Sequence, residues 1–206
     1  MNRGSQRCPL AHAEWHYINA TEMEAMQTQD WQLLEQQRAT FRAEHQAGQV
    51  LAMFRAMREA PTFGYQINNY RHCLQSATLA LRDGRDEETV VVSLLHDIGF
   101  VICPEMHAEF AASLLGAYIS EANHWMLLHH PIFQNIHVHG HPDPAFDRHA
   151  RERWRGHPHF EWTAEWVARY DQNALDPNYD CAPLEFFEPM VYRVFERAPQ
   201  PKELKL

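Results

Sequence analysis

The clearest pattern of apolar and polar positions along the chain lies between residues 67 and 84. Apolar residues recur there at spacings of three and four, the period of a helix with one buried face: Ile67, Tyr70, Leu74, Ala77 and Leu81. Asp83 and Gly84 follow, a pair typical of turns. The spacing predicts a helix over 67–81 that also carries His72 on its inward side.

A second helix is predicted directly after this turn. Asp86 suits the N-cap, and Glu87 and Glu88 suit the first turn, because carboxylates there interact favourably with the helix dipole. Apolar residues then repeat on one face until Gly99 ends the helix: Val90, Val91, Leu94, Leu95 and Ile98. His96 and Asp97 therefore fall at the end of an apolar helix.

The N-terminal region is predicted to hold a tail and two scaffold helices. Residues 1 to about 20 show no period and form a tail or a strap. Asp30 suits the N-cap of the first helix, Gly48 interrupts it, and Pro61 closes the second.

Downstream of Gly99 the pattern predicts an extended connector over 101–103 and then further helices. They start at or near Pro104, Glu121, Phe160 and Phe187. The helix from Glu121 is expected to end where Pro131 follows His130.

Because every predicted element is a helix, we expect an all-α fold. Its 206 residues, 45% of them hydrophobic, suit a single compact domain. Within it we expect a tail and scaffold helices over 1–60, a helical bundle with an irregular, histidine-rich loop over 61–197, and a polar tail over 198–206.

Charge and cysteine usage narrow the function. The net charge is −9, and the only lysines are Lys202 and Lys205, so no basic stripe is available for nucleic acid or an anionic membrane. The four cysteines show no paired spacing, and the first residues lack the apolar core of a signal peptide. We therefore expect a cytoplasmic protein without nucleic-acid or membrane partners.

Polar residues that are predicted to point inward come from five helices. They are His72, His96, Asp97, His107, Asp171 and one of His129 and His130. Buried carboxylates and imidazoles are costly unless paired, and a divalent cation suits both. One metal ion takes about four to six ligands, so four imidazoles and two carboxylates, one of them bridging, fit two adjacent ions. Without a thiolate, the donor set suits iron or manganese at least as well as zinc.

Two irregular segments are candidates for lining a pocket beside these residues. The loop 61–69, with Tyr65, leads into the helix of His72, although a helix start with capping asparagines explains it equally well. Residues 131–159 are rich in histidine but lack the cysteines of structural zinc sites, which favours a pocket-lining loop. Arginines in this segment are expected to form a solvated face, with one of them a candidate for binding an anionic substrate.

The arrangement of His72, His96-Asp97 and Asp171 resembles the HD-domain superfamily, an all-helical metal-dependent fold, over roughly residues 62–175. The added His107 and His130 resemble its dinuclear branch. That branch contains phosphohydrolases and also mixed-valent diiron oxygenases of the myo-inositol oxygenase and hydroxyphosphonate oxygenase type, which cleave C–C or C–P bonds with O2.

Two local features favour the oxygenases. Gln75 and the Ser76-Ala77 that follow it match the form His-x-x-Gln-Ser/Thr-Ala. Gly99 is not followed by the lysine that many hydrolases, and also myo-inositol oxygenase, carry there. The residues with which the phosphonate-cleaving members bind phosphonate are missing. Gln134, Arg148 or the loop histidines can replace them, so an anionic substrate stays open.

The resemblance implies two iron ions in a mixed-valent Fe(II)/Fe(III) state, with manganese or zinc as alternatives. Asp97 is then the bridging catalytic residue. His130 rather than His129 is the fourth histidine ligand, and His129 supports it from outside the metal ligands. We therefore expect a diiron oxygenase that acts on a small hydroxylated substrate with O2. The alternatives are a dinuclear phosphohydrolase and a non-catalytic regulatory HD domain.

Overall fold

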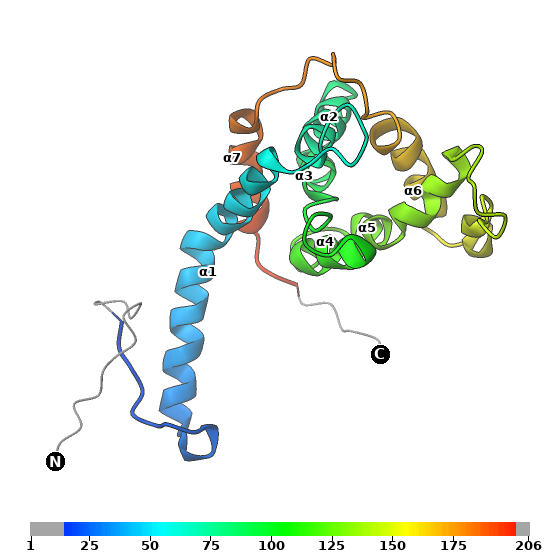
Figure 1. Cartoon of the computed structure of the whole chain (residues 1–206). Coiled ribbons are helices and arrows are strands. Elements are labelled where there is room, and N and C mark those ends of the chain that lie inside the picture. The colour runs from blue at the N-terminus through cyan, green and yellow to red at the C-terminus, as the bar shows by residue number, and fades with distance from the viewer. Residues whose placement is uncertain (1–14, 201–206) are drawn as a thin grey trace. The chain divides into compact units, whose positions relative to one another are not determined.

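The computed structural model describes residues 15–200, and every regular element in that range is helical (Figure 1). The all-α prediction is therefore confirmed. The chain divides into two compact units, residues 1–46 and 47–206. Residues 1–14 of the expected N-terminal tail and 201–206 of the expected polar tail lie outside the described residues. No helix in the described range is long and apolar enough to cross a membrane.

A single long helix, α1 (Thr28–Ala56), replaces the two predicted scaffold helices. It follows the 3-10 turn η1 (Met23–Ala25) and ends in η2 (Met57–Glu59). The predicted break at Gly48 is wrong, because a glycine costs a helix interior only about 1 kcal/mol, and buried side chains beyond it hold the helix together: Val50, Leu51 and Phe54. Asp30 lies in the first turn, where its carboxylate accepts the Gln27 N–H, and is not the N-cap.

Both helices predicted around Asp83 and Gly84 form, although the second ends at Leu95, before the predicted end at Gly99. They are α2 (Asn69–Arg82) and α3 (Glu87–Leu95), which pack against each other. The Asn68 and Asp86 side chains cap them by accepting backbone N–H groups three residues on, at 3.1 and 2.8 Å. Gly84 has a φ of +74°, which closes the turn at no steric cost.

Residues 96–102 form successive turns, so the extended connector predicted over 101–103 does not form. Gly99 explains the difference: its carbonyl accepts the Cys103 N–H at 2.8 Å, and a Cβ at this position would lie 2.9 Å from Phe110. The missing side chain therefore lets the next helix approach closely. That helix, α4 (His107–Leu115), follows the 3-10 turn η3 (Pro104–Met106).

The helix α5 (Glu121–Gln134) packs against α4 and continues through Pro131, so the predicted end at this proline is wrong. Proline removes one helical hydrogen bond, but Met126, Leu127 and Phe133 on either side of it are fully buried. After the 3-10 turn η4 (Asn135–His137) comes the irregular, histidine-rich stretch, which ends at η5 (Ala150–Trp154).

The last helices close the core of the second unit. Helix α6 (Phe160–Trp166) continues into a π-helical turn, η6 (Val167–Asp171), and α7 (Leu184–Phe195) packs on α3. Such π-turns often mark functional sites. Here the turn ends at Asp171, whose side chain is buried.

Candidate metal centre

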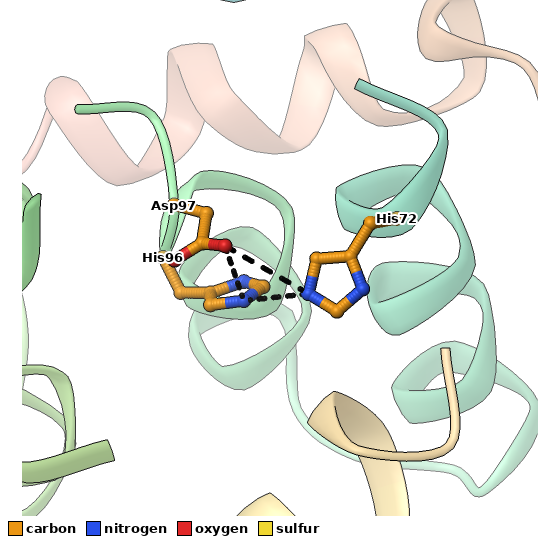
Figure 2. A group of neighbouring side chains, drawn as sticks. All are labelled: His72, His96 and Asp97. Atoms are coloured by element: carbon orange, nitrogen blue, oxygen red, sulfur yellow. Dashed lines mark hydrogen bonds and ion pairs between the residues drawn. The ribbon is translucent and has the colours of Figure 1, made fainter. Parts of the chain in front are cut away.

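Three of the predicted ligands meet where α2 faces the end of α3 (Figure 2). His72 projects from α2, while His96 and Asp97 directly follow α3. The Nε2 atoms of the two histidines are 3.1 Å apart, and all three residues are buried. Because α2 packs against α3, the three side chains come together, as the sequence predicted.

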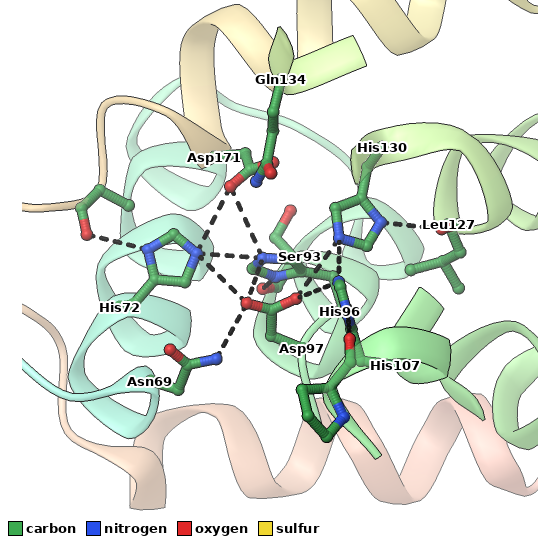
Figure 3. Close-up of polar contacts among 12 residues, drawn as sticks. Asn69, His72, Ser93, His96, Asp97, His107, Leu127, His130, Gln134 and Asp171 are labelled. Carbon is green, nitrogen blue, oxygen red and sulfur yellow. Dashed lines mark hydrogen bonds and ion pairs between the residues drawn. The ribbon is translucent and has the colours of Figure 1, made fainter. Parts of the chain in front are cut away.

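The other three predicted ligands complete the cluster from α4, α5 and the π-turn (Figure 3). The Nε2 atoms of His107 and His130 are 3.3 Å apart. Asp171 Oδ1 lies 3.4 Å from His72 Nε2. The structure thus gathers all six residues, and their donor atoms form overlapping groups that can hold a metal ion.

The four imidazoles make the same kind of hydrogen bond (Figure 3). Each Nδ1 lies within 3.0 Å of a backbone carbonyl oxygen, which belongs to Ala174, Ser93, Pro104 and Leu127 for His72, His96, His107 and His130 respectively. A carbonyl only accepts, so each Nδ1 carries a proton and each neutral ring turns its Nε2 lone pair inward. Pairs of lone pairs about 3 Å apart repel unless a cation lies between them.

The carboxylate of Asp97 joins the two histidine pairs. Its Oδ1 lies 3.3 Å from His107 Nε2 and 3.4 Å from His130 Nε2. Its Oδ2 lies 3.9 Å from His72 Nε2 and 3.7 Å from His96 Nε2. Each oxygen therefore faces a different pair, which is the arrangement of a carboxylate that bridges two ions.

The separations between 3.1 and 3.4 Å fit metal coordination. Bonds of about 2.1 Å place neighbouring ligand atoms about 3.0 Å apart at right angles and about 3.4 Å apart in a tetrahedron. In addition, Asp97 Oδ1 and Asp171 Oδ1 are buried without a hydrogen-bond donor. Buried carboxylate oxygens rarely go unpaired, so the orphaned atoms are the ones that a cation would satisfy.

Two amide side chains hold the remaining carboxylate oxygens. Asn69 Nδ2 donates to Asp97 Oδ2 at 3.0 Å, and Gln134 Nε2 donates to Asp171 Oδ2 at 2.7 Å. Such outer hydrogen bonds fix the direction in which a ligand presents its other oxygen. Gln134, which the sequence offered as a substrate-binding or supporting residue, thus supports Asp171 and also lines the cavity. The contact of Asn69 with Asp97 was missed, because Asn69 also reads as a helix-start residue.

Protonation equilibria in the cluster reflect its crowded charges. Burial favours neutral His72, but the carboxylates of Asp171 and Asp97 outweigh it and raise the pKa of His72 to about 9. Burial lowers the pKa of His96 to about 4. Burial opposes ionisation of Asp97, yet the His96, His130 and His72 rings hold the pKa of this carboxyl well below its ordinary value. The cluster therefore attracts a positive charge, which without metal is a proton.

A cavity of about 310 Å³ opens beside the cluster. Its inner end is polar, with Asp97, His107 and Asp171 together with Asn69 and Gln134. Its apolar wall consists of Tyr65, Ile67, Phe100, Val138 and Leu175. Over residues 15–200, no arginine or lysine lines this cavity.

Both irregular segments line the cavity, as predicted. From the first, Tyr65 lines it together with Ile67 and Asn69. From the histidine-rich stretch, Gln134, His137 and Val138 line it, whereas His141 stacks on Phe146. Gln172 and Phe100 also line the cavity and were missed, because nothing in the local pattern distinguishes them from ordinary surface or core residues.

Three lower-ranked candidates lie elsewhere. His129 stacks on Trp125 at 3.9 Å and gives its Nδ1–H to the Trp125 carbonyl, so its predicted place beside His130 is corrected. Arg148 donates to the Ile136 carbonyl at 2.6 Å and ties down the loop instead of facing the cavity. Gln75 acts indirectly, because its side-chain oxygen accepts the Asp176 N–H. This contact steadies the stretch around Ala174, whose carbonyl accepts the His72 Nδ1–H.

Comparison of the sequence with protein-family models and with curated proteins found no match.

Proposed function

We propose that this protein is a dinuclear metal-dependent enzyme of the HD-domain type. The observation that carries the proposal is the pairing of four inward Nε2 atoms around the two oxygens of Asp97, next to a cavity of about 310 Å³. A purely structural ion needs no adjoining space, whereas catalytic sites keep a position open for substrate.

Within this class we propose a diiron oxygenase that cleaves a C–C or C–P bond of a small hydroxylated substrate with O2. The cavity lacks the arginine or lysine side chains that commonly bind phosphate groups. This supports a substrate of low charge over a nucleotide, and a C–C bond over a C–P bond. The His72-to-Ala77 segment with Gln75 supports the same choice by its resemblance to the oxygenases.

Two irons would supply the one-electron chemistry that O2 requires. One would be held by His72, His96 and Asp171, the other by His107 and His130, and Asp97 would lie between them. The chain's own residues orient and enclose. Asn69 and Gln134 fix the carboxylates. Phe100 and Ile67 keep water from one side of the cavity, which strengthens polar interactions inside it.

The test is oxygen uptake by iron-loaded protein with a panel of small 1,2-diols and 2-hydroxy acids, run beside an anaerobic control. The proposal expects turnover that stops without O2 and falls at least 100-fold in His107→Ala. His129→Ala is the matched control, because His129 lies next to a ligand in sequence but stacks on Trp125, and it should keep wild-type turnover.

Hydrolysis of phosphoesters at equal rates with and without O2, supported by manganese or zinc, would contradict the oxygenase and make phosphohydrolase the function. The same ligand set serves that reaction, since two Lewis acids lower the pKa of a water between them.

A further inference from the structure

Large apolar side chains are exposed close in sequence to residues that line the cavity. Six of the twelve that are exposed in the described range lie in three of the four segments that carry cavity residues, each between 40% and 64% exposed: Phe63, Tyr65, Val101, Ile102, Met106 and Leu175. We call these six residues the apolar collar. Exposed apolar residues are ordinary when scattered, but a contiguous group marks a binding surface.

The collar is continuous with the cavity wall. Tyr65 and Leu175 belong to both. The Phe63 ring lies 6.1 Å from the ring of Phe100, which lines the cavity. Ile102 follows Phe100 in the same run of turns, and Met106 directly precedes His107. An apolar surface therefore runs from the apolar wall of the cavity, at Phe100, Tyr65 and Leu175, toward the outside.

Phe63 is held outward at a conformational cost. Its φ of +52° is the only positive value at a non-glycine residue in the described range. A bulky side chain rarely adopts this conformation, and such strain persists where function retains it. Burial would stabilise the phenyl ring, yet 61% of Phe63 is exposed. The loop is thus shaped to present an apolar group at the mouth.

We propose that the collar binds the hydrocarbon tail of an amphipathic substrate whose hydroxylated head lies at the six ligands. This inference rests on the proposed function and adds the substrate class to it. The cavity of about 310 Å³ lies at the small end of ligand pockets, which run from about 300 to 1,000 Å³. A substrate that is too long for the cavity would continue over the collar.

Charge argues against a membrane surface as the occupant. The three collar segments, residues 61–66, 100–106 and 172–176, contain the acidic Glu105 and Asp176 and no arginine or lysine. Surfaces that bind anionic membranes need basic residues beside the apolar ones. A neutral or singly charged tail-bearing molecule meets no such requirement.

The test is calorimetric binding of straight-chain 1,2-diols, from propane-1,2-diol to decane-1,2-diol, to the iron-loaded full chain without O2. Affinity should rise about two- to fourfold per methylene, as expected for one-sided to full burial. Phe63→Asn, which suits a positive φ, and Ile102→Ser should weaken binding of the C10 diol about threefold to tenfold and leave the C3 diol unchanged. Phe186→Ser, an exposed apolar residue on α7, is the matched control and should bind like wild type.

Three outcomes separate this inference from the proposed function. Affinity that is independent of chain length, in protein that binds two irons, overturns the tail inference and leaves the enzyme proposal standing. Chain-length dependence in protein that binds no iron supports the tail groove and contradicts the enzyme proposal. A collar substitution that converts a dimer to a monomer in sedimentation, with no change in diol affinity, makes the collar an interface between copies and overturns the inference.

Discussion

At the scale of single residues, Pro131 orients a candidate ligand through the N–H that it lacks. In a helix, the carbonyl of Leu127 would accept the N–H of residue 131. Proline has none, and the freed carbonyl accepts His130 Nδ1–H at 2.8 Å instead. Periodicity could not separate His129 from His130. The structure separates them because only His130 turns its Nε2 to Asp97, at 3.4 Å.

Pro131→Ala should therefore weaken metal binding without unfolding the protein. The new N–H competes for the Leu127 carbonyl and releases the His130 ring, and loss of such an outer partner typically costs about 10- to 100-fold in metal affinity. Metal titration monitored by competition with a chelator measures this loss. Pro189→Ala in α7, the other proline inside a helix, should leave the affinity unchanged. If both variants bind metal with equal affinity, Pro131 does not orient His130.

At the scale of elements, the sequence predicted helices where apolar periodicity was strong and failed where it relied on single residues. Helix α3 formed with its expected N-cap, Asp86. Helix α2 is capped by Asn68, as in the helix-start interpretation of the loop before it. Gly48 and Pro131 did not end their helices, because the local penalties of about 1 and 3 kcal/mol are outweighed by packing that the local pattern does not reveal.

Two glycines should respond to alanine with opposite signs. A Cβ on Gly99 would meet Phe110 at 2.9 Å, so Gly99→Ala should lower the free energy of unfolding by about 1–3 kcal/mol. Gly48 lies inside α1, and a Cβ there would make an ordinary contact, 3.5 Å from Tyr192 Oη of α7. Gly48→Ala should therefore raise that free energy by about 0.5–1 kcal/mol. Urea denaturation measures both, and a destabilised Gly48→Ala variant would contradict the continuous helix.

At the scale of the whole molecule, five helical segments converge on one buried cluster, and this convergence was predictable in part. The inward face of each helix follows from its period, so five of the six candidate ligands could be chosen from the periodic pattern, whereas the choice of His130 over His129 rested on the resemblance. The cavity could not, because its wall combines residues from segments far apart, such as Ile67, Val138 and Leu175. The contacts of the Ala174 and Ser93 carbonyls with the histidine rings could not be predicted either, because every residue type supplies a backbone carbonyl.

The metal-free protein should be most stable near pH 6.5. The pKa of His72 is raised from 6.5 to about 9 by folding, so its contribution is fully present below pH 6.5 and is lost as the pH rises to 9. The pKa of His96 is lowered from 6.5 to about 4, so its contribution is present above pH 6.5 and is lost as the pH falls to 4.

Thermal unfolding from pH 4 to pH 9 tests this dependence. The metal-loaded protein should not lose stability between pH 6.5 and pH 9, because bound metal replaces the proton on His72. Parallel curves for the two forms across this alkaline range would show that metal and proton do not compete for the same ring.

The most direct test of the central claim is the metal content of anaerobically prepared protein, with electron paramagnetic resonance after partial oxidation. We expect two irons per chain and a signal from a coupled mixed-valent pair, with the coupling lost in Asp97→Ala because no carboxylate then joins the two histidine pairs. One iron or none per chain, or the spectrum of an isolated ion that Asp97→Ala leaves unchanged, would contradict it.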